Sequence, residues 1–153
     1  MKNNSREFLE FVNIAEQIIA KIGLMHSTAS NFDTGVQLYQ KEIHTIQAIG
    51  NSSGINITKL AKYMHVTKGA VSQTVRKLVN KELVRKSHPI GNNKEVILEL
   101  TDLGWIGFYA HEKIHKGMFD LVRNYLGDDY QPTLEKFIAL MTGFINLLDK
   151  SSK

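Results

Sequence analysis

Two of the six histidines, His111 and His115, stand four positions apart in a segment whose apolar pattern predicts a helix. At that spacing two imidazoles project from one helix face, with β-carbons about 5–6 Å apart. Such a pair is a common way to offer two nitrogen ligands to Zn²⁺, which takes about four ligands in a tetrahedral array. A solvated helix face produces the same spacing by chance, so spacing alone favours that simpler interpretation over metal binding.

The chain contains no cysteine, which excludes disulfides, thiolate metal ligands, a cysteine nucleophile and thiol redox sensing. Any metal must therefore use histidine or carboxylate ligands. No HExxH, P-loop, GxSxG or dinucleotide-binding motif occurs, and we expect the protein not to be an enzyme.

Positive charge is concentrated in the middle of the chain. Residues 56–94 hold nine of the nineteen Lys and Arg residues and a single acid, Glu82, which gives this segment a formal charge of +8 and leaves −4 for the rest. Such segregation produces a positive field on one surface, and nucleic acid is the commonest polyanion that matches it. A merely solvated charged face would explain the near-absence of acids less well.

The elements that must position these residues follow from hydrophobic periodicity and turn residues. We expect helices at 5–23, 37–49, 57–64, 68–81, 102–126 and about 130–149, and strands at 83–88 and 95–100. Ser5 is the expected cap of the first helix, and Gly23 and Gly127 are expected to end two of them. The fold class is mainly α with a small β-hairpin, which is the outline of a winged helix–turn–helix.

In a helix–turn–helix the second helix enters the major groove, and the helix expected at 68–81 occupies that place. Gln73 suits adenine and Arg76 suits guanine, since each can make two hydrogen bonds to a base edge. The full set of predicted DNA contacts is Thr67, Lys68, Gly69, Ser72, Gln73, Thr74, Arg76 and Lys77, with Asn92, Asn93 and Lys94 in the hairpin.

The first and last two helices carry more apolar surface than thin helices of one subunit can bury, and this favours a homodimer. We therefore divide the chain into a DNA-binding lobe, residues 34–101, and a helical dimerisation region, residues 1–33 and 102–153. No apolar run approaches the roughly 18 residues that span a bilayer, and no signal-peptide pattern starts the chain, so we expect a cytoplasmic protein with no membrane partner.

The segment ITKLAKYMHVTKGAVSQTVRKLVNKEL, residues 57–83, is followed by a hairpin and by LTDLG at residues 100–104. This combination resembles the MarR family of transcription regulators, and the resemblance covers nearly the whole chain. It implies a homodimer that binds a palindromic operator in double-stranded DNA. The wing of that family usually carries Asp-x-Arg, where this chain has Asn92-Asn93-Lys94, so the acid that braces the basic residue is missing.

Within that family the resemblance extends to zinc-responsive repressors of zinc uptake. Carried over by position, His44, His111 and His115 match three histidine ligands of that subgroup, and His26 falls where the subgroup has a glutamate. The resemblance thus implies one Zn(II) site per subunit. The positions of a second metal site in that subgroup are Phe32, Ile43 and Ala110 here, and none of these side chains can bind a metal.

The main hypothesis is a homodimeric DNA-binding repressor controlled by Zn(II) or a similar divalent ion. An alternative keeps DNA binding but assigns control to a small aromatic ligand, in a crevice that Met25, Phe32, Tyr39, Trp105 and Tyr109 are candidates to line. A third hypothesis, a metal-dependent hydrolase, is weaker, because four histidines tend to close the open coordination position that zinc catalysis needs.

Overall fold

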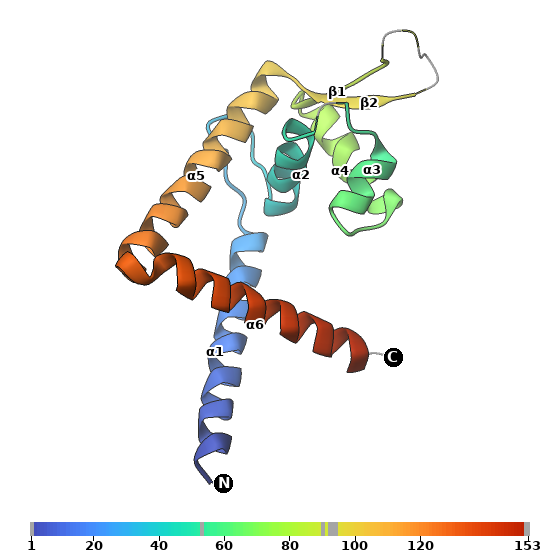
Figure 1. The fold of residues 1–153 in the computed structure, drawn as a ribbon. Coiled ribbons are helices and arrows are strands. Elements are labelled where there is room, and N and C mark those ends of the chain that lie inside the picture. Colours follow the sequence, from blue (N-terminus) through green and yellow to red (C-terminus); the bar gives the residue numbers. More distant parts are fainter. Residues whose placement is uncertain (1, 53, 90, 92–94, 152–153) are drawn as a thin grey trace. The chain divides into compact units, whose positions relative to one another are not determined.

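The computed structural model describes residues 2–52, 54–89, 91 and 95–151 of the chain, without the side chains of residues 2–5 and His26. It contains two compact units, Met1–His111 and Glu112–Lys153. The described residues form six α-helices, one short 3-10 helix and two strands (Figure 1). The predicted mainly α fold with a small hairpin is confirmed.

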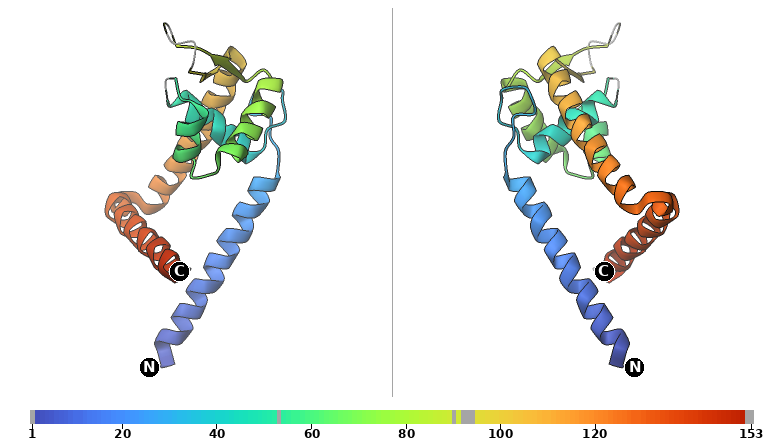
Figure 2. Two further views of the ribbon diagram at one scale, coloured as in Figure 1. Left: turned by 90° about the vertical axis from the view of Figure 1, so that its right-hand side faces the viewer. Right: turned by 90° about the vertical axis from the view of Figure 1, so that its left-hand side faces the viewer.

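Three short helices pack together to form the centre of the first unit: α2 (Gln40–Gly50), α3 (Ile57–Tyr63) and α4 (Lys68–Asn80). Figure 2 shows them grouped beneath the hairpin in both views. The core residues with no solvent exposure at all are Leu38, Ile43, Ile46, Leu60, Leu78 and Leu83. Since burial of a large aliphatic side chain contributes about 1.5–3 kcal/mol, this cluster is the main stabilising element of the unit.

The hairpin consists of β1 (Val84–Ser87) and β2 (Ile97–Leu100), paired antiparallel from Val84↔Leu100 to Ser87↔Ile97. Val84, Leu98 and Leu100 are buried, so one face of the hairpin covers the helices. An isolated bridge joins Ile55, just before α3, to Leu98, with the Leu98 N–H donating to the Ile55 carbonyl at 2.9 Å. The hairpin is thereby attached to the helix–turn–helix along β2.

The LTDLG segment joins the hairpin to α5 (Asp102–Leu126), and each of its key residues has a distinct role. The Thr101 hydroxyl donates to the Glu82 carbonyl at 2.6 Å and accepts from the Gly104 N–H at 3.1 Å, so it caps α5. Gly104 is buried, and a β-carbon there would lie 2.1 Å from the Leu83 carbonyl oxygen. Only glycine allows α5 to approach the turn after α4 this closely.

Helix α1 (Lys2–Ser27) is longer than predicted at both ends. It starts before Ser5, which is therefore not its cap, and it continues through Gly23, where the space around the position is open. A single glycine within a helix costs only about 1 kcal/mol relative to alanine, so it does not end the helix by itself. The next helix, α2, starts three residues later than predicted, because Tyr39 is its N-cap.

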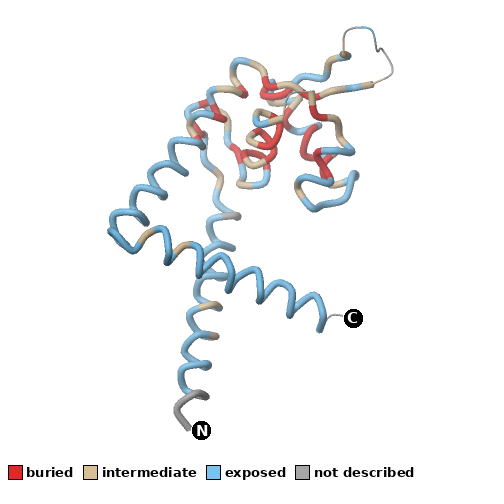
Figure 3. The backbone as a smooth tube through the Cα atoms, in the orientation of Figure 1, coloured by how far each residue is buried: buried red, intermediate tan, exposed pale blue. Residues whose placement is uncertain are grey.

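The second unit contains the later part of α5, a 3-10 turn (Gly127–Asp129) and α6 (Tyr130–Ser151). Leu126 ends α5 as predicted, and Gly127 has the left-handed φ of +57° that such a position favours. None of the described residues in Glu112–Lys153 is buried (Figure 3). Throughout the described part of the chain, no helix combines the length and apolarity needed to cross a membrane.

Candidate nucleic-acid interface and metal centre

Helix α4 has the position and surface of a recognition helix. Thr67 caps its start, accepting a hydrogen bond from the Ala70 N–H at 3.2 Å. Its buried residues are mainly apolar, and its exposed residues are mainly polar or basic. The predicted contacts that are exposed are Thr67, Lys68, Gly69, Gln73, Arg76 and Lys77, with Ser72 half-buried.

Thr74 is not one of these exposed residues. The residue is buried, and its hydroxyl donates to the Ala70 carbonyl at 3.1 Å. Position 74 lies three residues after Val71 and four before Leu78, so it falls on the inward stripe of the helix. We therefore correct the prediction and remove Thr74 from the candidate DNA contacts.

A partly buried ion pair fixes the C-terminal end of α4 to α2. The Lys81 ammonium donates to Glu42 Oε1 at 2.7 Å and to the Gln37 carbonyl at 2.8 Å. The other carboxylate oxygen of Glu42 accepts from the Tyr39 N–H at 3.0 Å and so caps the start of α2. Glu42 is only 5% exposed, and a buried carboxylate needs such partners to offset its lost hydration.

The base of the wing carries a second ion pair, this one on the surface. Arg85 and Glu99 face each other across the hairpin, with Arg85 Nε donating to Glu99 Oε2 at 3.0 Å. This hydrogen bond from Arg85 holds the pKa of the Glu99 carboxyl below its usual value. The predicted wing contacts Asn92, Asn93 and Lys94 lie outside the described residues and stay predictions.

His44 on α2 and His111 on α5 lie next to each other, as expected from the resemblance. Their ring centroids are 5.2 Å apart. His111 is 2% exposed, and the Phe32 ring contacts it edge-on with 5.8 Å between centroids. His115 follows one turn later on α5 and is exposed, and nitrogens of these three histidines all lie within 4.8 Å of one another.

This histidine triad (His44, His111 and His115) fits a zinc ion by ligand type and nearly by geometry. Zn–N bonds of about 2.0–2.1 Å in a tetrahedral array place nitrogens about 3.3 Å apart. Side-chain rotations that shorten the distances between these nitrogens by up to about 1.5 Å would therefore bring all three around one ion. The fourth predicted ligand, His26, belongs to α1, but its side chain lies outside the described residues.

The positions that correspond to a second metal site have apolar environments. Phe32 and Ile43 belong to the buried core, and Ala110 packs against it. The remaining two histidines are exposed, as expected: His65 lies in the turn between α3 and α4, and His88 follows β1.

The sequence analysis missed Gln40, whose side-chain nitrogen lies 2.9 Å from Nε2 of His44. The two residues are four apart at the start of α2, so the spacing that identified His111 and His115 applies to this pair as well. Any metal that takes Nε2 of His44 must displace this amide.

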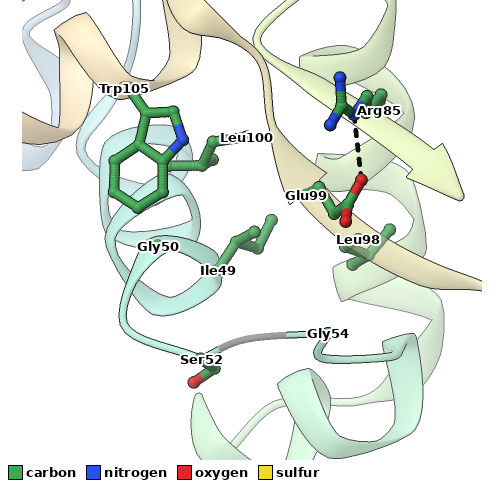
Figure 4. Close-up of a pocket in the computed structure, with 9 residues that line it drawn as sticks. All are labelled: Ile49, Gly50, Ser52, Gly54, Arg85, Leu98, Glu99, Leu100 and Trp105. Atoms are coloured by element: carbon green, nitrogen blue, oxygen red, sulfur yellow. Dashed lines mark hydrogen bonds and ion pairs between the residues drawn. The ribbon is translucent and has the colours of Figure 1, made fainter. Parts of the chain in front are cut away.

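A pocket of about 270 Å³ lies where the end of α2, the hairpin and the start of α5 meet. Figure 4 shows the Trp105 indole on one side and the Arg85–Glu99 pair on the other, with Ile49 and Leu100 between them. Trp105 is thus the one residue of the proposed aromatic crevice that lines this pocket. Phe32 is instead part of the core, and Met25, Tyr39 and Tyr109 are largely exposed.

Comparison with known proteins agrees with this geometry. Residues 38–96 match the model of the MarR family. The chain is 30% identical over 110 residues to the HTH-type transcriptional regulator PchR of Bacillus subtilis (strain 168). That match covers 62% of this chain and 65% of PchR, and two further regulators of that organism are matched over 48% and 53% of their length.

Solved structures of similar fold cover almost the whole chain. Streptococcus pneumoniae FabT in complex with DNA superimposes with a TM-score of 0.67 at 22% identity, covering 97% of this chain and 99% of FabT. The zinc-dependent MarR regulator AdcR in its Zn(II)-bound state also gives 0.67, at 19% identity, covering 95% and 99%. At these identities the superpositions show a shared fold.

Proposed function

We propose that this chain is a winged-helix transcription regulator of the MarR family, and that it represses transcription as a homodimer bound to a palindromic operator. The match of residues 38–96 to the MarR family model and the similarity to PchR support this proposal. The observation that carries this proposal is the outer face of α4, where Lys68, Gln73, Arg76 and Lys77 are exposed on a capped helix in the basic segment of the chain. In this arrangement α4 enters the major groove, and its N-terminal residues meet the base edges.

The unburied apolar surface of α6 supports the homodimer. Its large exposed apolar side chains are Phe137, Ile138, Leu140, Met141, Phe144, Ile145, Leu147 and Leu148. A monomeric soluble protein rarely exposes so many large apolar side chains along one helix, and a symmetric second copy would cover them. Dimerisation also presents two copies of α4, which must lie about 34 Å apart to reach successive major grooves on one face of DNA.

We further propose that a divalent metal such as Zn(II), held by the histidine triad and His26, controls operator affinity. His44 belongs to α2, and α2 is fixed to the end of α4 through Glu42 and Lys81. A metal bound at His44 therefore acts on the element to which the recognition helix is attached. The ion can change the affinity for DNA only to the extent that it binds the DNA-binding conformation of the protein more tightly than the other conformations.

The test of DNA binding is fluorescence anisotropy with candidate palindromic duplexes at two salt concentrations. A MarR-type dimer gives affinity that falls steeply with salt, because each neutralised phosphate releases counterions. The proposed function would be excluded if the purified protein were monomeric and did not bind duplex DNA at low salt.

The test of metal control is calorimetric titration with Zn²⁺ of the wild type, His111→Ala and His65→Ala. His65 is a matched control, since it is an exposed histidine outside the triad. We expect only His111→Ala to lose affinity for Zn²⁺, by at least about tenfold, because the variant lacks one of the few ligands that hold the ion. Equal binding by all three proteins would exclude the triad as the metal site.

A second candidate effector is a small planar organic ligand, which the pocket beside Trp105 favours (Figure 4). Trp105 is the only tryptophan of the chain, so its fluorescence reports directly on this pocket. Benzoate and its hydroxylated derivatives are suitable probes. Saturable quenching that is lost in Arg85→Met, with release of DNA, would favour this effector over a metal.

The curated relatives that the chain matches are HTH-type transcriptional regulators, and this supports the prediction that the protein is not an enzyme. The histidine triad is therefore interpreted as a regulatory site, and the hydrolase hypothesis is not retained.

A further inference from the structure

The base of the wing is held by two hydrogen bonds that meet at one residue, Glu95. His88, just after β1, places Nδ1 2.9 Å from the Glu95 carbonyl oxygen. Asn56, just before α3, donates its side-chain amide to Glu95 Oε1 at 2.9 Å. The two arms of the hairpin and the distant segment before α3 are thus joined at the point where the hairpin leaves the folded lobe.

The bond from His88 closes the hairpin beyond the end of its ladder. The last paired residues are Ser87 and Ile97, so His88 and Glu95 lie on the tip side of that pair. A carbonyl oxygen can only accept a hydrogen bond, which means that Nδ1 of His88 carries the hydrogen. The side chain therefore continues the connection between the two strands after the backbone pairs end.

The bond from Asn56 attaches the same point to the helix–turn–helix. Asn56 caps α3, because its Oδ1 accepts from the Lys59 N–H at 2.9 Å while its amide nitrogen binds Glu95. Both ends of the amide are engaged, and this fixes its orientation. The neighbouring bridge between Ile55 and Leu98 gives the β2 arm a second attachment.

We propose that Asn56, His88 and Glu95 form a wing brace, a set of positioning residues that fixes the direction of the hairpin for contact with DNA. The brace would replace the missing acid of the Asp-x-Arg pattern, since Lys94, the predicted wing contact, directly precedes Glu95 in the sequence. Glu95 carries negative charge next to that contact, which opposes DNA binding by itself. In the proposed brace, the hydrogen bonds of Glu95 favour DNA binding by more than its negative charge opposes it. This inference rests on the proposed DNA-binding function.

The test separates the hydrogen bond from the charge by comparing Glu95→Gln with Glu95→Ala. Both variants remove the negative charge, but only glutamine keeps a side-chain oxygen that can accept from Asn56. Affinity for a duplex that the wild type binds is measured by anisotropy. We expect Glu95→Gln to bind at least as tightly as the wild type, and Glu95→Ala to bind about 3–10-fold more weakly than Glu95→Gln, which is the effect of one well-placed hydrogen bond.

A double-mutant cycle with Lys94→Ala shows whether the brace acts through the wing. If it does, Glu95→Ala adds little to the loss that Lys94→Ala causes alone, because the contact being positioned is already absent. Asn56→Ser provides an independent variant, since serine still caps α3 but cannot reach Glu95. It should show the same non-additivity, and thermal unfolding of each variant checks that the lobe stays folded.

The outcomes are distinct. Equal affinity of Glu95→Ala and Glu95→Gln, or losses that add fully to that of Lys94→Ala, would overturn the wing brace while leaving DNA binding intact. A wild type that binds no duplex at low salt would overturn the proposed function and the brace with it. A specific loss in Glu95→Ala and Asn56→Ser that disappears in the Lys94→Ala background supports the brace.

Discussion

Gly104→Ala is predicted to destabilise the protein, although alanine is the better helix former. The added β-carbon would lie 2.1 Å from the Leu83 carbonyl oxygen, 3.1 Å from the Leu83 carbonyl carbon and 3.2 Å from Leu100 Cβ. The nearest atoms belong to the backbone, so no side-chain rotation relieves the contact. To restore an ordinary separation of about 3.2 Å, α5 must move about 1 Å away from the turn after α4.

The expected magnitude follows from two opposing terms. Overpacking of this kind costs about 1–3 kcal/mol, and a contact between two backbones belongs at the upper end of that range. The gain in helix propensity from glycine to alanine is about 1 kcal/mol. The net loss is therefore about 2 kcal/mol, which lowers the midpoint of thermal unfolding by about 4–8 °C for a chain of this size.

The assay is thermal unfolding followed by circular dichroism at one fixed protein concentration, since dimerisation makes the midpoint depend on concentration. Gly117→Ala is the matched control, because it lies in the same helix with nothing within 4 Å of the added carbon. It should gain up to about 1 kcal/mol. If Gly104→Ala proved as stable as Gly117→Ala, the close approach of α5 to Leu83 would not constrain the fold.

Three further outcomes are expected. Lys81→Met should cost about 3–5 kcal/mol of folding free energy in chemical denaturation, because it leaves the Glu42 carboxylate buried without its partner, and Glu42→Met in the same chain should recover most of that loss. Thr101→Val should cost about 1–2 kcal/mol in the same assay, since it removes the cap of α5 and leaves a carbonyl acceptor unpaired; no change would argue against the cap. Arg76→Ala should lower affinity mainly for the preferred operator and so relax base preference, whereas Lys77→Ala should weaken all duplexes alike; equal effects on all sequences from both changes would mean that Arg76 does not read bases.

The parts of the fold with strong periodicity and clear caps could be predicted from the sequence. Helix α5 begins and ends at the predicted residues, and α4 begins where Thr67 caps it. The inward position of Thr74 could also have been predicted, because residues 71, 74, 75 and 78 form one helical stripe.

The contacts between distant segments could not be predicted in this way. Glu42 and Lys81 are 39 positions apart, as are Asn56 and Glu95, and neither pair has a local signal. The packing of α2 against α4 brings the first pair together, and the bridge between β2 and the segment before α3 brings the second. The proximity of His44 and His111 followed from a family resemblance and not from spacing, which identified only the pair on α5.

The C-terminal end of α4 is joined by hydrogen bonds to two other elements of the fold. Lys81 is held by α2, and the next residue, Glu82, is held by Thr101 at the start of α5. The opposite end carries the exposed residues Thr67 and Lys68. For a tilt about the C-terminal end, over a helix length of about 20 Å, a rotation of about 10° would displace the first turn by about 3.5 Å. That displacement is close to the spacing of about 3.4 Å between successive bases, so a small rotation is enough to shift the reading residues by one base step.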